Sequence, residues 1–207
     1  MENNDNKDSI SCKVIVVGDS SVGKTSIINR YLDKYNSNEK ATVGAAYSTK
    51  IQIIGDYKIS FDIWDTAGEE KFRSLNSIFY KEAYICLIVY DITNEESFQS
   101  IKNYWYKYIK ENSIPEIIFA IVANKSDLYT QEKVKEKEVK AYCKEINSMF
   151  FLTSALENRS IDNIFKKVGE KFINSDLFQK VQSNFLDNEQ KISLKVNNKK
   201  KKKKKFC

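Results

Sequence analysis

A phosphate-binding loop is the first chemical signal in the sequence. Residues 18–25 read G-D-S-S-V-G-K-T, which matches the pattern G-x-x-x-x-G-K-[S/T], and the apolar stretch 12–17 comes directly before them. Glycines let backbone N–H groups turn inward around phosphate oxygens. Lys24 supplies a positive charge for the β- and γ-phosphates, and the Thr25 hydroxyl is a ligand for Mg²⁺. The pattern therefore predicts a nucleotide phosphate site between a strand and a helix.

A second motif supplies a metal-binding carboxylate. Residues 65–68 read D-T-A-G and follow another apolar stretch. We expect Asp65 to hold the Mg²⁺ ion, through water, and the backbone N–H of Gly68 to reach the γ-phosphate. Because the phosphate loop precedes it in the chain, this motif indicates a nucleoside triphosphate rather than an ordinary turn.

A third motif selects the base. Residues 124–127 read N-K-S-D. Asn124 can hydrogen-bond the purine and the nearby backbone, the aliphatic part of Lys125 can lie across the ring, and Asp127 can accept two N–H groups of guanine. Adenine has neither donor and would leave the carboxylate unpaired, which is costly. The sequence therefore favours GTP, and Asp127 argues against the alternative of an ATP-using enzyme.

The elements that position these motifs alternate between strands and helices. Apolar runs and period-2 patterns predict strands at 12–17, 47–54, 58–64, 84–90, 116–123 and 149–152. Helical patterns cover 24–33, 95–110, 131–146 and 160–173, with Asn94 or Ser97 as a cap of the second helix. We predict an α/β fold of three layers, with a mostly parallel six-stranded sheet, one antiparallel edge strand and helices on both faces. The motifs then meet at the carboxyl ends of the strands.

Positive charge is concentrated at the C-terminal end. Residues 191–207 contain nine lysines and no acidic residue, so the rest of the chain carries a net charge of −3 although the whole chain carries +6. A basic nucleic-acid-binding face is therefore not expected on the folded body. The length and a hydrophobic content of 42% suit one domain, which we place at 11–174. We expect residues 1–10 to be disordered and residues 175–207 to form a flexible tail.

The cysteines do not form a metal-binding pattern. Cys12 and Cys86 lie in apolar strands, Cys143 lies in a charged helix, and the sequence contains no C-x-x-C pair and no histidine. We expect these three to be buried structural residues. The polar start and the absence of a long apolar run predict no signal peptide and no membrane span, and hence a reduced, cytosolic setting.

The motifs together resemble the Ras superfamily of small GTPases and, within it, the Rab family of vesicle-traffic switches. The resemblance covers residues 12–174, including W-D-T-A-G-E-E at 64–70 and V-Y-D-I-T at 89–93. The alanine pair at 45–46 and the run D-I-T-N-E-E-S-F at 91–98 are most similar to the early-endosomal branch. The resemblance implies a GTP-hydrolysing molecular switch that regulates vesicle-mediated, endocytic protein transport.

The resemblance also implies further site residues. Residues 34–44 would form switch I, in which Thr42 closes on Mg²⁺ and the γ-phosphate. Tyr35 would pack on the base, although an ordinary surface tyrosine is the alternative because this loop is one residue shorter than usual. Residues 66–80 would form switch II. The complete set of predicted nucleotide-binding residues is Ser20, Ser21, Val22, Gly23, Lys24, Thr25, Ser26, Tyr35, Thr42, Gly68, Asn124, Lys125, Asp127, Ser154, Ala155 and Leu156.

One departure from the family bears on catalysis. Glu69 stands where the family has the glutamine that orients the attacking water. A carboxylate accepts a hydrogen bond from water but has no N–H to offer the transition state. Glu69 is compatible with three outcomes: slow GTP hydrolysis, near-normal GTP hydrolysis, or a protein that stays bound to GTP almost all the time and acts as a scaffold. With Lys24 and Gly68, Glu69 completes the predicted catalytic set; Leu156 stands where lysine is usual, which weakens packing near the base.

The C-terminal tail resembles a lipid-anchored end. Seven lysines at 199–205 precede Phe206 and the terminal Cys207, which would carry a prenyl group. One lipid with a polybasic patch anchors stably to an anionic leaflet. The alternatives are a solvated basic tail, or a nuclear-address or RNA-binding tail, and the absence of interleaved aromatic residues disfavours RNA. The expected location is the cytosol and the cytoplasmic face of intracellular membranes, with endosomes ahead of the Golgi and plasma membrane.

The expected partners follow from the same resemblance. They are effectors, an exchange factor and an activating protein at the two switches, together with the prenylation machinery and an extraction chaperone. The expected small-molecule partners are GTP, GDP and Mg²⁺, and the protein is expected to be a monomer that binds no nucleic acid.

Overall fold

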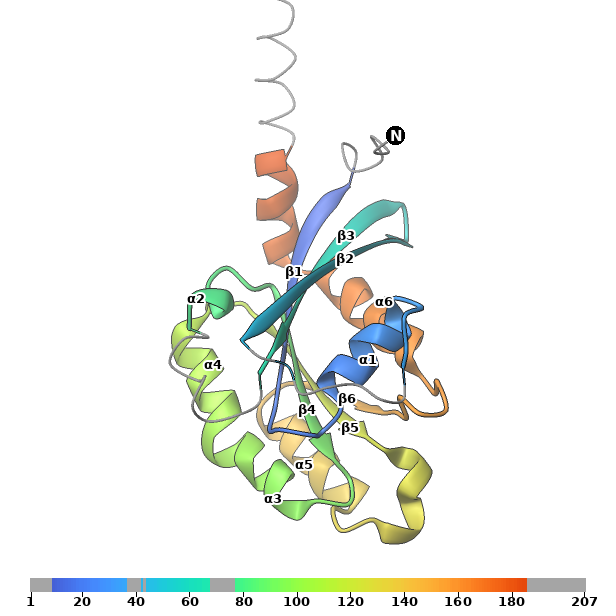
Figure 1. The fold of residues 1–207 in the computed structure, drawn as a ribbon. Coiled ribbons are helices and arrows are strands. Elements are labelled where there is room, and N and C mark those ends of the chain that lie inside the picture. The colour runs from blue at the N-terminus through green and yellow to red at the C-terminus, as the bar shows by residue number, and fades with distance from the viewer. Residues whose placement is uncertain (1–8, 37–41, 43, 68–76, 186–207) are drawn as a thin grey trace, which may run out of the picture.

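A six-stranded sheet forms the centre of the described part of the chain (Figure 1). The computed structural model describes residues 9–36, 42, 44–67 and 77–185. The strand order is β2-β3-β1-β4-β5-β6, and only the β2–β3 pair is antiparallel. The predicted α/β fold is therefore confirmed. The strands are β1 (Ile10–Val17), β2 (Ala45–Ile54), β3 (Tyr57–Thr66), β4 (Ile85–Asp91), β5 (Ile118–Asn124) and β6 (Met149–Leu152).

Helices cover both faces of the sheet. Strands β4 and β5 are buried along their whole length, as continuous apolar strands of a parallel sheet require. Along β1, Val14 and Val16 join one apolar cluster while Ile15 and Val17 join the other. The first cluster lies under α1 (Lys24–Tyr31) and α6 (Ile161–Ile173). The second lies under α3 (Glu95–Ser100), η3 (Ile101–Trp105), α4 (Tyr106–Asn112) and α5 (Glu136–Glu145).

The helix predicted at 95–110 is confirmed, with an internal irregularity that the sequence did not predict. Asn94 caps it, because its side-chain oxygen accepts hydrogen bonds from the backbone N–H groups of Glu96 and Ser97. The segment η3 is a π-helical turn within this otherwise α-helical stretch. A π turn shifts the following residues around the axis and is common at functional sites. Here it contains Trp105, which reaches the phosphate loop.

The helix predicted at 131–146 is wrong in its first third. The structure has the 3₁₀ helix η4 (Ser126–Gln131), then a non-helical stretch, and α5 begins only at Glu136. Val134 is buried, and the backbone N–H groups of Lys133 and Val134 both reach the carbonyl of Ile92. Burial of this valine and the tertiary hydrogen bonds outweigh the local helix propensity of the lysines and glutamates.

The folded body continues past the predicted boundary at 174. Residues 176–185 are helical and lie at the top of Figure 1, whereas the prediction placed a flexible tail from 175 onward. Phe178 is only 2% exposed and meets the rings of Tyr57 and Phe172 edge to face. Burial of this ring stabilises the extra helix. In the part of the chain that the structure describes, no helix is long and apolar enough to cross a membrane.

The strand at 149–152 has the predicted limits, and the turn at 55–56 joins β2 and β3 as a hairpin. Other limits shift by one to two residues, and β1 begins at Ile10, which is buried although residues 1–10 were expected to be disordered. Cys12, Cys86 and Cys143 are buried free cysteines. A short helix, α2 (Ser77–Tyr80), lies within the predicted switch II and had no sequence signal.

Candidate functional site

The phosphate loop connects β1 to α1 and has a conformation that requires glycine at both ends. Gly18 and Gly23 have φ values of 138° and 95°, in the range that side chains rarely adopt. A Cβ atom on Gly18 would lie 2.2 Å from the Val89 carbonyl oxygen, and one on Gly23 would lie 2.3 Å from Nδ2 of Asn124. The loop therefore packs against β4 and the base motif too closely for any larger residue.

Lys24 lies across the loop that precedes it. Its ammonium group donates to the carbonyl oxygens of Gly18 at 2.8 Å and Asp19 at 2.7 Å, and the residue is 6% exposed. Burial lowers the pKa of Lys24 to about 8, although the charges of Asp65 and Asp19 act to raise it. A phosphate group bound at the loop would favour the charged ammonium further.

Three oxygen-bearing side chains converge beside Lys24. The Thr25 hydroxyl donates to Oδ2 of Asp65 at 2.6 Å, and the Thr42 hydroxyl lies 2.8 Å from that of Thr25 and 3.2 Å from the same carboxylate oxygen. Hydroxyl and carboxylate oxygens are the ligands that Mg²⁺ prefers. Among the described residues no three His, Cys, Asp or Glu side chains form a metal-binding group, so hydroxyls and nucleotide phosphates would complete the coordination.

The base motif is tied to the phosphate loop through Asn124. Its side-chain Nδ2 donates to the Val22 carbonyl at 2.8 Å, and its Oδ1 accepts from the Ala155 backbone N–H at 3.2 Å. The Ser154 hydroxyl donates to the Asp127 carboxylate. These contacts bring residues 124–127 and 154–156 together, although the two segments lie in separate parts of the sequence.

Lys125 is held by an acidic partner that sequence reasoning missed. Its ammonium lies 2.6 Å from Oδ2 of Asp91, whose Oδ1 accepts from the Thr93 backbone N–H and hydroxyl, both at 2.8 Å. Burial raises the pKa of Asp91, but the hydrogen bonds from Lys125 and Thr93 outweigh it and lower the pKa below its ordinary value. The charged end of Lys125 is thus anchored, which leaves its aliphatic part available to cover a base.

A hollow of about 330 Å³ joins the base motif to the loop. Leu128 also lines it and was not among the predicted site residues, although its position directly after the N-K-S-D motif indicated that it would lie near the base. Ser20 and Val22 belong to the loop, but they are not lining residues. The lining residues are Ser21, Gly23, Ser26, Tyr35, Asn124, Lys125, Asp127, Leu128, Ala155 and Leu156.

Gly68, Glu69 and Cys207 lie outside the described residues, so their predicted roles stay predictions.

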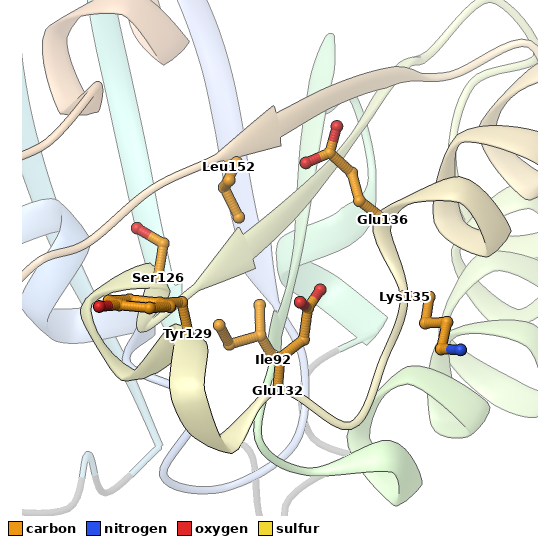
Figure 2. Close-up of a pocket in the computed structure, with 7 residues that line it drawn as sticks. All are labelled: Ile92, Ser126, Tyr129, Glu132, Lys135, Glu136 and Leu152. Atoms are coloured by element: carbon orange, nitrogen blue, oxygen red, sulfur yellow. The ribbon is translucent and has the colours of Figure 1, made fainter.

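A second hollow of about 320 Å³ is lined in part by Ser126 and Tyr129 of η4 (Figure 2). Ile92 and Leu152 contribute apolar surface, and Glu132 and Glu136 place two carboxylates at its wall. Carboxylates repel phosphate, and no glycine loop lines this hollow. Although Lys135 also lines it, the second hollow is therefore less suited to a nucleotide phosphate than the first.

A row of aromatic side chains crosses the edge of the sheet next to the site. Trp64 lies between Tyr47 and Phe79, with ring centroids 5.2 and 5.0 Å apart, and Tyr47 is 54% exposed. The Tyr47 hydroxyl donates to Asp62 at 3.0 Å. Sequence reasoning did not single out this row, because its members come from β2, β3 and α2.

The fold and the site define a P-loop nucleotide-binding protein with a guanine-selective base motif. Comparison with known proteins agrees, because the family model described as Ras family matches residues 13–174. The chain belongs to the Ras superfamily and, within it, to the Rab small GTPases. It is an enzyme that hydrolyses GTP to GDP and phosphate.

Three similar proteins illustrate the extent of the match. The chain is 36% identical to the Ras-related protein RabJ of Dictyostelium discoideum over 80% of its own length. The match covers 64% of RabJ, so the chain spans less than two thirds of that protein. It is 38% identical to a Ras-related protein Rab-7a of Paramecium octaurelia over 76% and 79% of the two chains. It is 33% identical to Rab7 of Drosophila melanogaster over 84% and 86%.

Proposed function

We propose that this protein is a GTP/GDP switch that acts in vesicle-mediated, endocytic transport. The main supporting observation has two parts. The oxygens of Thr25, Thr42 and Asp65 converge next to Lys24, and the loop that carries Lys24 and Thr25 also lines, through Ser21, Gly23 and Ser26, the hollow that holds Asp127. That arrangement suits a nucleotide with its phosphates on the loop and its guanine at the base motif. The names of the similar proteins support a role in Rab-type vesicle traffic.

The switch depends on Thr42. Its hydroxyl is close to Thr25 and Asp65 in this structure, so an Mg²⁺ ion held there would bind the segment that carries Thr42 as well. Bound Mg²⁺ would neutralise charge on the β- and γ-phosphates. Loss of the γ-phosphate removes one anchor of Thr42 and of Gly68, and the two switches then relax.

Effectors have an aromatic surface available beside the switches. Tyr47, Trp64 and Phe79 present neighbouring rings on β2, β3 and α2. Aromatic residues are enriched at interaction hot spots because they bury large areas at low entropic cost. A conformational change at Thr42 or in switch II would alter access to this row, so it suits a partner that distinguishes GTP from GDP.

Nucleotide binding is the first test of this function. Fluorescent GTP, GDP and ATP are titrated against the purified protein, with and without Mg²⁺. We expect tight GTP and GDP binding that weakens when Mg²⁺ is chelated, and no measurable ATP binding, because adenine offers Asp127 no donor. ATP binding equal to GTP binding would overturn the proposal. Single-turnover hydrolysis of Mg²⁺·GTP then measures the rate of the switch.

Glu69 supports a second candidate, a hydrolysis-impaired scaffold that stays bound to GTP and recruits effectors. We expect Glu69→Gln to raise the single-turnover rate by at least tenfold, because the amide supplies an N–H for the transition state that the carboxylate lacks. Asp127→Asn, which impairs base binding instead, serves as the comparison. A native rate already equal to that of the glutamine variant would rule out the scaffold.

A further inference from the structure

Arg30, near the end of α1, contacts three parts of the base-binding region at once. Its Nε donates to the Ala155 carbonyl at 2.6 Å, and its Nη2 donates to the Leu156 carbonyl at 2.7 Å. The centre of its guanidinium group lies 3.4 Å from the centroid of the Tyr35 ring. All three of these partners line the hollow that we assign to the nucleotide.

Only arginine can make this set of contacts. A guanidinium group is planar, so it can donate in its plane to two adjacent carbonyls while its face stacks on an aromatic ring. Lysine has a single flexible ammonium that serves the carbonyls or the ring but not both. Arg30 is half-buried, so the stacked pair is partly shielded from water and the cation–π attraction is stronger than on an open surface.

The contacts of Arg30 extend an existing network to switch I. The Ala155 N–H already donates to Asn124, and Asn124 donates to the Val22 carbonyl in the phosphate loop. Arg30 donates a hydrogen bond to the carbonyl oxygen of the same Ala155 and stacks on the ring of Tyr35 at the start of switch I. The phosphate loop, the base motif, the 154–156 loop and Tyr35 thereby form one connected unit.

Leu156 provides a reason for the contacts of Arg30 at the base end of the site. Leu156 is 58% exposed, and the family resemblance places a lysine at this position, near the base. The leucine keeps the backbone contact but provides no charge. In this chain a positive charge reaches the same place from α1, through Arg30.

We infer that Arg30 is a positioning residue that holds Tyr35 and the 154–156 loop around the guanine and thereby sets the rate of nucleotide dissociation. The inference rests on the proposed function, since it assigns a role within the same site. Arg30 acts through Tyr35 and the loop and need not touch the nucleotide. Its three contacts are all at the base end, so GTP cleavage at the phosphate end should not depend on it.

The experiment compares four variants of the full chain loaded with fluorescent GDP. Arg30→Gln removes the charge and the planar stack. Arg30→Lys keeps the charge alone. The double variant Arg30→Gln with Leu156→Lys returns a positive charge from the loop. Lys166→Gln, on the exposed side of α6, is the matched control for loss of one surface charge.

We expect GDP to dissociate about tenfold faster from Arg30→Gln, since a tenfold change corresponds to about 1.4 kcal/mol, the size of one or two such contacts. Arg30→Lys should lie between the native protein and Arg30→Gln, and it serves as the test by itself if the glutamine variant does not fold. Leu156→Lys should slow dissociation from the glutamine variant again, which a merely structural loss would not allow. Single-turnover hydrolysis of bound GTP should change less than twofold.

The two possible failures are distinguishable. If the native protein binds no GDP, the proposed function is wrong. If the native protein binds GDP and Arg30→Gln releases it at the native rate, or if Leu156→Lys gives no rescue, the role of Arg30 is overturned. A loss of hydrolysis without a change in dissociation would also contradict it.

Discussion

Single side chains in this protein act mainly by fixing the position of another side chain. Asp91 holds the ammonium of Lys125, Asn124 joins two loops, and Ser154 donates to Asp127. Each of these groups is polar and buried or half-buried, so it is costly to leave without a hydrogen bond. These hydrogen bonds fix the side chains of the predicted base-binding surface relative to one another, and fewer side chains then need to be ordered when a nucleotide binds.

We expect Asp91→Asn to destabilise the protein by about 1–2 kcal/mol at pH 7, because the ion pair with Lys125 is lost from a buried site. The native pKa of Asp91 is below that of an unfolded aspartate, so its contribution is present above pH ~4 and is lost as the pH falls further. Urea unfolding at pH 7 and pH 3.5 should therefore show a difference between variant and native protein that shrinks in acid.

Glu170→Gln provides the control for this measurement, because Glu170 forms a surface pair with Lys167 on α6. Exposed pairs of this type contribute little to stability. An Asp91→Asn difference that is the same at both pH values would contradict the assigned role of the Asp91 charge.

At the scale of elements, the helix that spans Glu95 to Asn112 does more than cover the sheet. Its π-helical turn contains Trp105, which is fully buried and donates from Nε1 to the Asp19 carboxylate at 2.8 Å. Asp19 also accepts from Lys24 through its backbone carbonyl. The irregular turn thus connects a packing helix to the phosphate loop.

We expect Trp105→Phe to lower the free energy of unfolding by about 1–2 kcal/mol and to speed GDP release a few-fold, because it removes the donor to Asp19 and leaves a small cavity. Chemical denaturation and fluorescent-GDP dissociation measure the two effects. Tyr106→Phe is the control, since its hydroxyl accepts a hydrogen bond from the exposed side chain of Lys110 and the substitution keeps the ring. Unchanged GDP release from Trp105→Phe would show that the turn does not position the loop.

The sequence was sufficient for elements whose signal is local. The short strand at 149–152 and the phosphate loop follow from apolar runs, glycine spacing and neighbouring helices. Features that depend on distant contacts were missed: Val134 interrupts a predicted helix because it packs in the core, and Phe178 extends the fold because it meets Tyr57. Arg30 gave no signal either, because an isolated arginine in a helix indicates its partners only when the fold is known.

The whole molecule places its two functional ends apart. The motifs lie at the carboxyl ends of the strands, at the bottom of Figure 1, and the helix at 176–185 lies at the top. The lysine-rich tail continues in sequence from that upper end. We propose that the tail attaches the protein to endosomal membranes, with Cys207 prenylated, while the nucleotide site stays accessible to the exchange factor and the activating protein.

We expect deletion of residues 186–207 to leave GDP binding intact and to abolish binding to anionic vesicles. Lysines near an anionic leaflet contribute about 1 kcal/mol each, so native binding should weaken as salt is raised. Co-sedimentation with phosphatidylserine vesicles measures this. Deletion of residues 206–207 alone keeps the lysines and separates their contribution from that of the lipid. Full vesicle binding by the 1–185 protein would contradict the assignment.

The two tryptophans of the chain give it a built-in optical readout. Trp64 directly precedes Asp65 and lies between Tyr47 and Phe79, so its emission follows the environment of the switch surface. Trp105 is buried against the phosphate loop, so its emission follows that loop instead. We therefore expect nucleotide exchange and hydrolysis to change the intrinsic fluorescence of unlabelled protein, and Trp105→Phe leaves Trp64 as the one tryptophan of the chain.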